Sequence, residues 1–202
     1  MQLFSKKLSE VNLVLLVAAF LTLTGNFTFL EKTLQIYPLS ENWLFLGSLF
    51  LFLFTFLSAL LIIFCFRWSL KPILIALLLI SAVVTYSTNN FGVVFDHNMI
   101  TNTFETDTSE LSDLVSIKSL IYFCLLGLIP STYVWKIQLV KSSIKTQLWQ
   151  RVKMLLALIV VFVIVVLSFS KHYTSFAREN RDLRLYITPT YYLYSSVKFI
   201  NS

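Results

Sequence analysis

Five apolar runs, each nearly free of charged residues, are the feature of this sequence that most limits its fold. A helix needs about 17–25 apolar residues to cross the hydrocarbon core of a membrane. Pro130 falls inside the fourth run and should kink a helix there. We predict spanning helices over about residues 11–30, 43–66, 72–88, 117–135 and 154–170.

The composition agrees with an integral membrane protein. Hydrophobic residues make up 57% of the chain and charged residues 13%, whereas about a quarter of a soluble domain is charged. The cations behind the net charge of +6 lie beside apolar runs, so we expect them to meet lipid headgroups and expect no nucleic acid partner. Cys65 and Cys124 fall within apolar runs and are expected to pack, not to form a disulfide or bind a metal.

The distribution of cations between the loops predicts the orientation. Five spans put the termini on opposite sides of the membrane. The side of the N-terminus carries Lys6, Lys7, Arg67, Lys71, Lys136, Lys141, Lys145, Arg151 and Lys153. On the other side the loops before the tail carry only Lys32 and Lys118. Because positive loops stay in the cytoplasm, we predict a cytoplasmic N-terminus and a C-terminus outside.

An acidic segment separates the third and fourth predicted spans. Residues 96–114 contain no glycine or proline, so a helix is allowed. On a helix, residues four apart share a face, which would align an amide, an amide, a hydroxyl and a carboxylate: Asn98, Asn102, Thr106 and Glu110. Such a row suits either a wet face of an amphipathic helix or the lining of a cleft for a zwitterionic lipid headgroup. His97 with Asp96 and Glu110 is too sparse a set to predict a metal site.

The residues after the fifth predicted span combine aromatic and basic side chains. This mixture favours the headgroup zone of a membrane. We therefore predict a five-span domain over residues 1–170 and an interfacial linker over residues 171–202, with a disordered C-terminal end as the alternative.

Two blocks of the sequence carry a family resemblance. The segment "FGVVFDHNMITNTFETDTSE" (91–110) resembles the one before the fourth span of bacterial lipid A phosphoethanolamine transferases, which include the mobile colistin-resistance enzymes. The tail resembles the periplasmic linker of the same family at His172, Tyr173, Ser175, Phe176, Arg178, Leu183, Arg184, Tyr186, Pro189, Tyr194, Ser195 and Lys198.

The resemblance implies a function and a site. Enzymes of this family move phosphoethanolamine from phosphatidylethanolamine to lipid A through a threonine in a periplasmic zinc domain. That domain is expected after the linker and outside this chain, so we expect no catalytic residue, metal or other cofactor here and no transferase activity from the chain alone. Asn102, Thr106 and Glu110 fall on the family's donor-lipid row, with Asn98 and Asp96 as possible supporting residues.

The expected setting is the bacterial inner membrane, with a periplasmic C-terminus. The expected partners are phosphatidylethanolamine, lipid A and the catalytic domain. The alternative function is a stand-alone, non-catalytic membrane protein that binds lipid or a partner. A transporter or channel is disfavoured because the predicted spans lack buried charges and the sequence shows no internal repeat.

Overall fold

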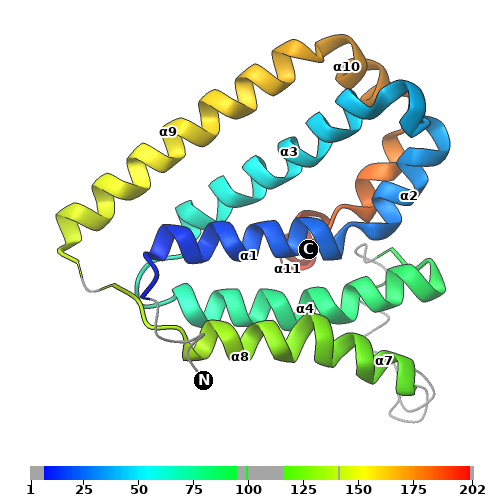
Figure 1. Cartoon of the computed structure of the whole chain (residues 1–202). Coiled ribbons are helices and arrows are strands. Elements are labelled where there is room, and N and C mark those ends of the chain that lie inside the picture. The colour runs from blue at the N-terminus through cyan, green and yellow to red at the C-terminus, as the bar shows by residue number, and fades with distance from the viewer. Residues whose placement is uncertain (1–6, 95–98, 100–115, 141, 201–202) are drawn as a thin grey trace.

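Helices account for nearly all of the backbone that the structure describes. The computed structural model describes residues 7–94, 99, 116–140 and 142–200. Within these ranges there is no strand beyond an isolated bridge between Leu8 and Leu139. Figure 1 shows that the long helices lead to one end of the bundle where α2 (Phe27–Ile36), α10 (Ser170–Glu179) and the end of α4 (Leu70–Phe91) lie. We call that end the tail end and the opposite one, where α1 (Glu10–Gly25) and α9 (Ile144–Ser168) begin, the N-terminal end.

The predicted all-α membrane fold is confirmed. Among the residues that the structure describes, four helical segments are long and apolar enough to span a membrane: α3 (Leu39–Phe64), α4 (Leu70–Phe91), the continuous segment Ile117–Lys136 and α9 (Ile144–Ser168). A fifth span is formed if α1 (Glu10–Gly25) and α2 (Phe27–Ile36), which meet at 57°, count as one. The protein is therefore a multi-pass membrane protein.

A single asparagine occupies the bend in the first predicted span. α1 begins at a Ser9 cap, whose Oγ accepts the backbone N–H of Asn12, and ends before Asn26. The Nδ2 of Asn26 donates to the carbonyl oxygens of Leu21 and Thr22, at 3.3 and 3.2 Å. These bonds partner carbonyls that the helix end would otherwise leave open, so the chain can turn without exposing polar backbone to lipid.

The fourth span contains a widened turn. It runs as α7 (Ile117–Tyr122), the π-helix η1 (Phe123–Leu128) and α8 (Ile129–Lys136). Pro130 in the first turn of α8 has no N–H, and its ring would crowd the carbonyl four residues earlier. A π turn just before it relieves that crowding. Gly127 packs closely on α4, because a Cβ there would lie 3.2 Å from the Cβ of Ala82.

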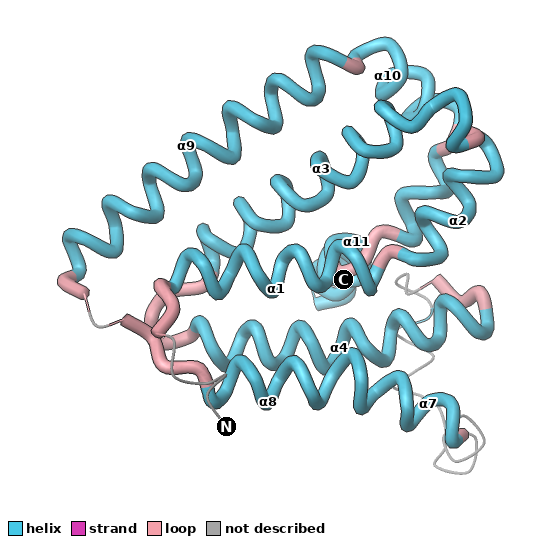
Figure 2. The backbone as a smooth tube through the Cα atoms, viewed as in Figure 1, coloured by secondary structure: helices cyan, strands magenta, loops and turns pink. Residues whose placement is uncertain are grey.

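The core lies between α1, α3 and α4, which Figure 2 shows at the centre of the molecule. Leu13, Leu74 and Leu78 are fully buried in it. By contrast, only 17% of the apolar window is buried in each of α9 and the fourth span. These two helices present most of their surface outward, as expected for helices that face lipid.

The tail folds back on the bundle as three short helices. They are α10 (Ser170–Glu179), the 3₁₀ helix η2 (Arg181–Tyr186) and α11 (Thr190–Ile200). Phe176 and Leu183 pack with Phe29 and Phe45 in a second apolar cluster. Tyr192 joins the main core, where its hydroxyl lies 3.1 Å from the Oγ of Ser81 in α4. The division at residue 170 between domain and linker stays a prediction.

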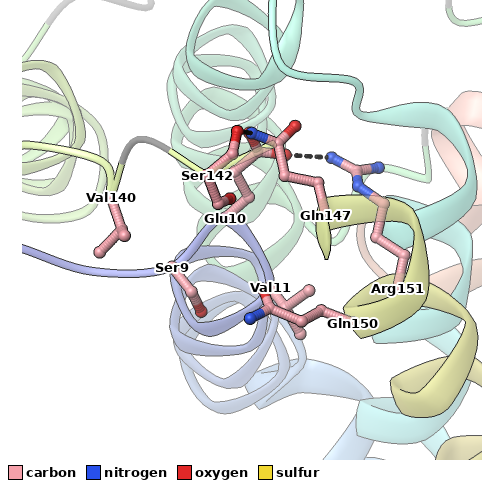
Figure 3. A pocket seen from close by; sticks show the side chains of 8 residues that line it. All are labelled: Ser9, Glu10, Val11, Val140, Ser142, Gln147, Gln150 and Arg151. Atoms are coloured by element: carbon pink, nitrogen blue, oxygen red, sulfur yellow. Dashed lines mark hydrogen bonds and ion pairs between the residues drawn. The ribbon is translucent and has the colours of Figure 1, made fainter. Parts of the chain in front are cut away.

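A buried ion pair holds the N-terminal end together. The Nη2 of Arg151 in α9 donates to the Oε2 of Glu10 in α1 at 2.8 Å (Figure 3). The Nη1 of Arg151 donates to the carbonyl of Ile62 in α3 at 2.9 Å. A polar cavity of about 40 Å³ lies beside the pair. The side chains of Arg151 and Glu10 are only 10% and 6% exposed. The arginine therefore joins three helices through largely buried contacts.

Breaking this pair is expected to destabilise the protein. Glu10→Gln and Arg151→Met each leave one buried group without its partner, which costs about 3–5 kcal/mol. The measurement is the thermal unfolding midpoint of the detergent-purified protein. The matched control is Arg178→Met, which breaks an exposed pair with Glu179 and should cost only about 0–1 kcal/mol. Equal midpoints for Arg151→Met and Arg178→Met would show that the buried pair stabilises the protein no more than the exposed pair does.

Candidate functional site

The predicted site residues Asp96, Asn98, Asn102, Thr106 and Glu110 lie outside the described residues. Their roles stay predictions. The structure does place both flanks of their segment, the end of α4 and the start of α7. The candidate site is therefore built from those flanks and from the groups around them.

The end of α4 turns sharply at a glycine. Gly92 has a φ of 65°, a left-handed conformation that favours glycine, and its N–H donates to the carbonyl of Thr88 at 3.1 Å. The hydroxyl of Thr88 in turn donates to the carbonyl of Val93 at 3.0 Å. These bonds fix the direction in which the chain leaves the helix.

The start of α7 is pinned to the same end of α4. Ser116 caps α7 through a reciprocal pair of bonds with Ser119. The Oγ of Ser116 lies 2.9 Å from the hydroxyl of Tyr86, and the Tyr86 ring packs edge-on against Tyr122 at 5.5 Å. The segment that carries the predicted row thus leaves and rejoins the bundle at the tail end.

A cleft opens beside these flanks. It has a volume of about 310 Å³ and lies between α1, α2, α4 and the fourth span; we call it the tail-end cleft. Its lining residues are Leu23, Thr24, Phe27, Asn89, Ile121, Tyr122, Leu125 and Leu126. Leu23, Phe27 and Leu125 are each more than half exposed, so the cleft is open to the surroundings along an apolar edge.

The cleft combines an apolar wall with a few polar groups. Thr24 and Asn89 add a hydroxyl and an amide, and the hydroxyl of Thr28 donates to the Oδ1 of Asn89. Asn89 lies in the last turn of α4, close to where the segment with the predicted row begins. An apolar chain fits such a wall, and a polar group at its edge would meet the Asn89 amide.

Sequence reasoning did not pick out Thr24 and Asn89. Asn89 was visible within "STNNFG" (87–92), a set of polar residues that also ends a helix. Thr24 was not predicted because a threonine in an apolar run often bonds only to its own helix. Its hydroxyl does donate to the carbonyl of Phe20. A polar residue close to the end of a span was the signal available.

The tail is attached at the bend through the side-chain amide of Asn26. Its Nδ2 donates to the carbonyl of Thr188, and its Oδ1 accepts the N–H of Thr188, both at 2.9 Å. Gly25 allows this close approach, because a Cβ there would lie 3.3 Å from the Cγ2 of Thr188. One residue thus holds the bend and the tail together.

No metal site is found in the part of the chain that the structure describes. Within it, no three His, Cys, Asp or Glu side chains gather to hold an ion. Cys65 is buried and Cys124 exposed, and both thiols are free. His97, Asp96 and Glu110 lie outside the described residues.

Comparisons with a family profile and with individual proteins all match the same kind of protein. The profile of the family described as phosphoethanolamine transferase EptA/EptB matches residues 53–202. Phosphatidylethanolamine transferase Mcr-1 from Escherichia coli is 34% identical over 193 residues, which cover 95% of this chain and 36% of that protein. Phosphoethanolamine transferase EptA from Escherichia coli K12 is 25% identical over 181 residues, or 88% of this chain and 33% of that one.

A solved structure shares the fold. Lipooligosaccharide phosphoethanolamine transferase A (EptA) from Neisseria meningitidis superposes with a TM-score of 0.90 at 19% identity. The match covers 97% of this chain and 37% of that protein. The chain therefore spans about a third of the length of the relatives that it matches.

Replacing Asn26 is expected to release the tail. Asn26→Leu leaves the N–H and carbonyl of Thr188 without partners, at about 1–3 kcal/mol for each buried group. Since about 1.4 kcal/mol is a factor of ten, amide hydrogen exchange over residues 183–196 should speed up by about tenfold or more. The control is Asn42→Leu, because the Asn42 amide donates only to Pro38 in its own turn. The same exchange rates in both variants would contradict the role of Asn26.

Proposed function

Because the chain belongs to the phosphoethanolamine transferase EptA/EptB family, we propose that it works as the membrane domain of such an enzyme and binds the donor lipid at its tail end. The donor is phosphatidylethanolamine. The tail end then faces the periplasm of a bacterial inner membrane and the N-terminal end faces the cytoplasm. The observation that carries the proposal is the tail-end cleft, an apolar opening lined by residues of the two helices, α4 and α7, that flank the segment of the predicted row.

The chemistry of the donor headgroup fits the residues available. Ethanolamine carries an ammonium, which needs an acceptor, and Glu110 supplies a carboxylate. The phosphate and glycerol oxygens need donors, which Asn102 and Thr106 supply. Asn98 and Asp96 would support the site from behind these residues, Asp96 as an acceptor. Charge-assisted bonds of this type are roughly twice as strong as neutral ones. The acyl chains would rest against Leu23, Phe27 and Leu125 in the cleft.

The proposed role is to hold and present the donor. Transfer to lipid A is assigned to a periplasmic catalytic domain with its own nucleophile and zinc site. In such a transferase the membrane domain contributes by position, because a bound headgroup next to the nucleophile reacts as if at high concentration. The residues of this chain are proposed to bind the donor lipid and not to take part in the chemical step.

Neutralising Glu110 is expected to weaken donor binding. The purified chain should retain phosphatidylethanolamine above its share of the membrane, as measured by lipid extraction and mass spectrometry. Glu110→Gln removes a charge-assisted bond of about 1.5–3 kcal/mol and should lower the retained amount about tenfold. Glu31→Gln, on the exposed face of α2, is the control. Loss of retention in both variants, or in neither, would refute the role of Glu110.

Filling the cleft tests the apolar half of the site. Leu125→Trp places a large ring in the cleft and should displace the lipid, lowering retained phosphatidylethanolamine about as far as Glu110→Gln does. Leu128→Trp is the matched control, since Leu128 lies in the same π-helix but does not line the cleft. If Leu128→Trp reduces retention as much, the loss comes from disturbing the helix and the cleft is not the binding site.

A further inference from the structure

A second cavity lies at the tail end and shares no lining residue with the tail-end cleft. It has a volume of about 330 Å³ and is enclosed by α2, α3, α9, α10 and η2. Figure 1 shows how α10 joins the end of α9 to the region where α2 and α3 meet. We call it the arginine cavity, because Arg181 and Arg184 are its only charged lining residues among those the structure describes.

The interior of the arginine cavity is apolar. Leu49 and Leu53 of α3 form one wall and Val166 of α9 another, with Phe176 of α10 behind them. Leu49 and Leu53 lie roughly three to four turns along α3 from its first residue. Both leucines belong to the long apolar run of α3, so this wall can contact a lipid acyl chain.

The two arginines lie on one side of η2. A 3₁₀ helix has three residues per turn, so side chains at i and i+3 lie one above the other. Both arginines are exposed. Among the described residues, the ion pairs are Arg151 with Glu10 and Arg178 with Glu179, so neither Arg181 nor Arg184 is neutralised there. Asp182 is exposed on the same helix but does not line the cavity.

Arginine pairs of this kind favour phosphate. A guanidinium presents its N–H groups in a planar fork that matches two phosphate oxygens. Among the described residues no carboxylate lines the cavity, so none of them offers an ammonium group an anionic partner. Tyr173, which also lines it, has its pKa raised by burial, although its bond to Ser48 acts in the opposite direction. The phenol therefore stays neutral and does not repel an anion.

We propose that the arginine cavity binds an anionic phospholipid, with one acyl chain between α3 and α9 and its phosphate on Arg181 and Arg184. The headgroup carries a net negative charge, as in phosphatidylglycerol. The lipid joins η2 to α3 and α9 and so fastens the tail to the membrane surface. This site is separate from the proposed donor site, which holds a zwitterionic lipid and relies on a carboxylate.

The test measures lipid binding to the whole purified chain. Phosphatidylglycerol, phosphatidylethanolamine and phosphatidylcholine with identical acyl chains are titrated in detergent, and bound lipid is counted by native mass spectrometry. Wild type should bind phosphatidylglycerol most tightly. The double variant Arg181→Gln/Arg184→Gln loses two charge-assisted contacts and should weaken that binding by about tenfold or more. Equal binding of all three lipids by wild type would overturn the proposal.

Two control pairs separate this site from general effects. Arg178→Gln removes an exposed arginine of α10 that does not line the cavity, and it should leave phosphatidylglycerol binding unchanged. Val166→Phe fills the cavity and should weaken binding, whereas Val163→Phe on the exposed side of α9 should not. The proposal would be overturned if Arg178→Gln weakened phosphatidylglycerol binding as much as the double arginine variant does. It would also be overturned if Val163→Phe weakened this binding as much as Val166→Phe does.

The donor site is tested separately in the same assay. Glu110→Gln should lower phosphatidylethanolamine retention and leave phosphatidylglycerol binding as in wild type. Failure of the donor proposal therefore leaves the result for the arginine cavity intact. If Glu110→Gln weakens phosphatidylglycerol binding as much as the double arginine variant does, the two lipids share one site and the separate anionic site is refuted.

Discussion

Lipid offers no hydrogen-bond partners, and the structure depends on how the chain meets that constraint. Within the spans the helices satisfy their own backbone. Where the first span bends, the amide of Asn26 bonds the carbonyls that the end of α1 releases and also the backbone of Thr188. The bend and the position of the tail therefore depend on the same side chain.

This bend also creates the two cavities of the tail end. Phe27 lines the tail-end cleft and Phe29 lines the arginine cavity, and both belong to α2. Residues two apart on a helix point in nearly opposite directions. α2 is therefore a wall between the cavities, one face toward α1, α4 and the fourth span and the other toward α3 and the tail. A straight first span would put neither phenylalanine in its place.

The sequence predicts the spans because hydropathy reports directly on contact with lipid. It does not predict the break at residue 26, since Asn26 and Gly25 are uncharged and sit inside a run that reads as continuous. One partner of Asn26 at the bend is Thr188, which is 162 residues away in the sequence, so the sequence around the bend does not reveal the contact. The row Asn102, Thr106 and Glu110 follows from helical spacing and remains a prediction. Asn89 was not predicted as a site residue, because the polar residue types that end a helix are also those that line a cleft.

The two ends of the bundle are held in different ways, which bears on lipid exchange. At the N-terminal end, besides the Glu10–Arg151 pair, the Nζ of Lys71 donates to the carbonyls of Trp135 and Ile137 at 2.7 and 2.8 Å. These charged contacts fix the spans relative to one another.

At the tail end, η1 supplies Leu125 and Leu126 to the cleft, and a π turn is a less regular part of a helix. A lipid that enters sideways meets this irregular turn, while the charged contacts at the opposite end keep the spans in register.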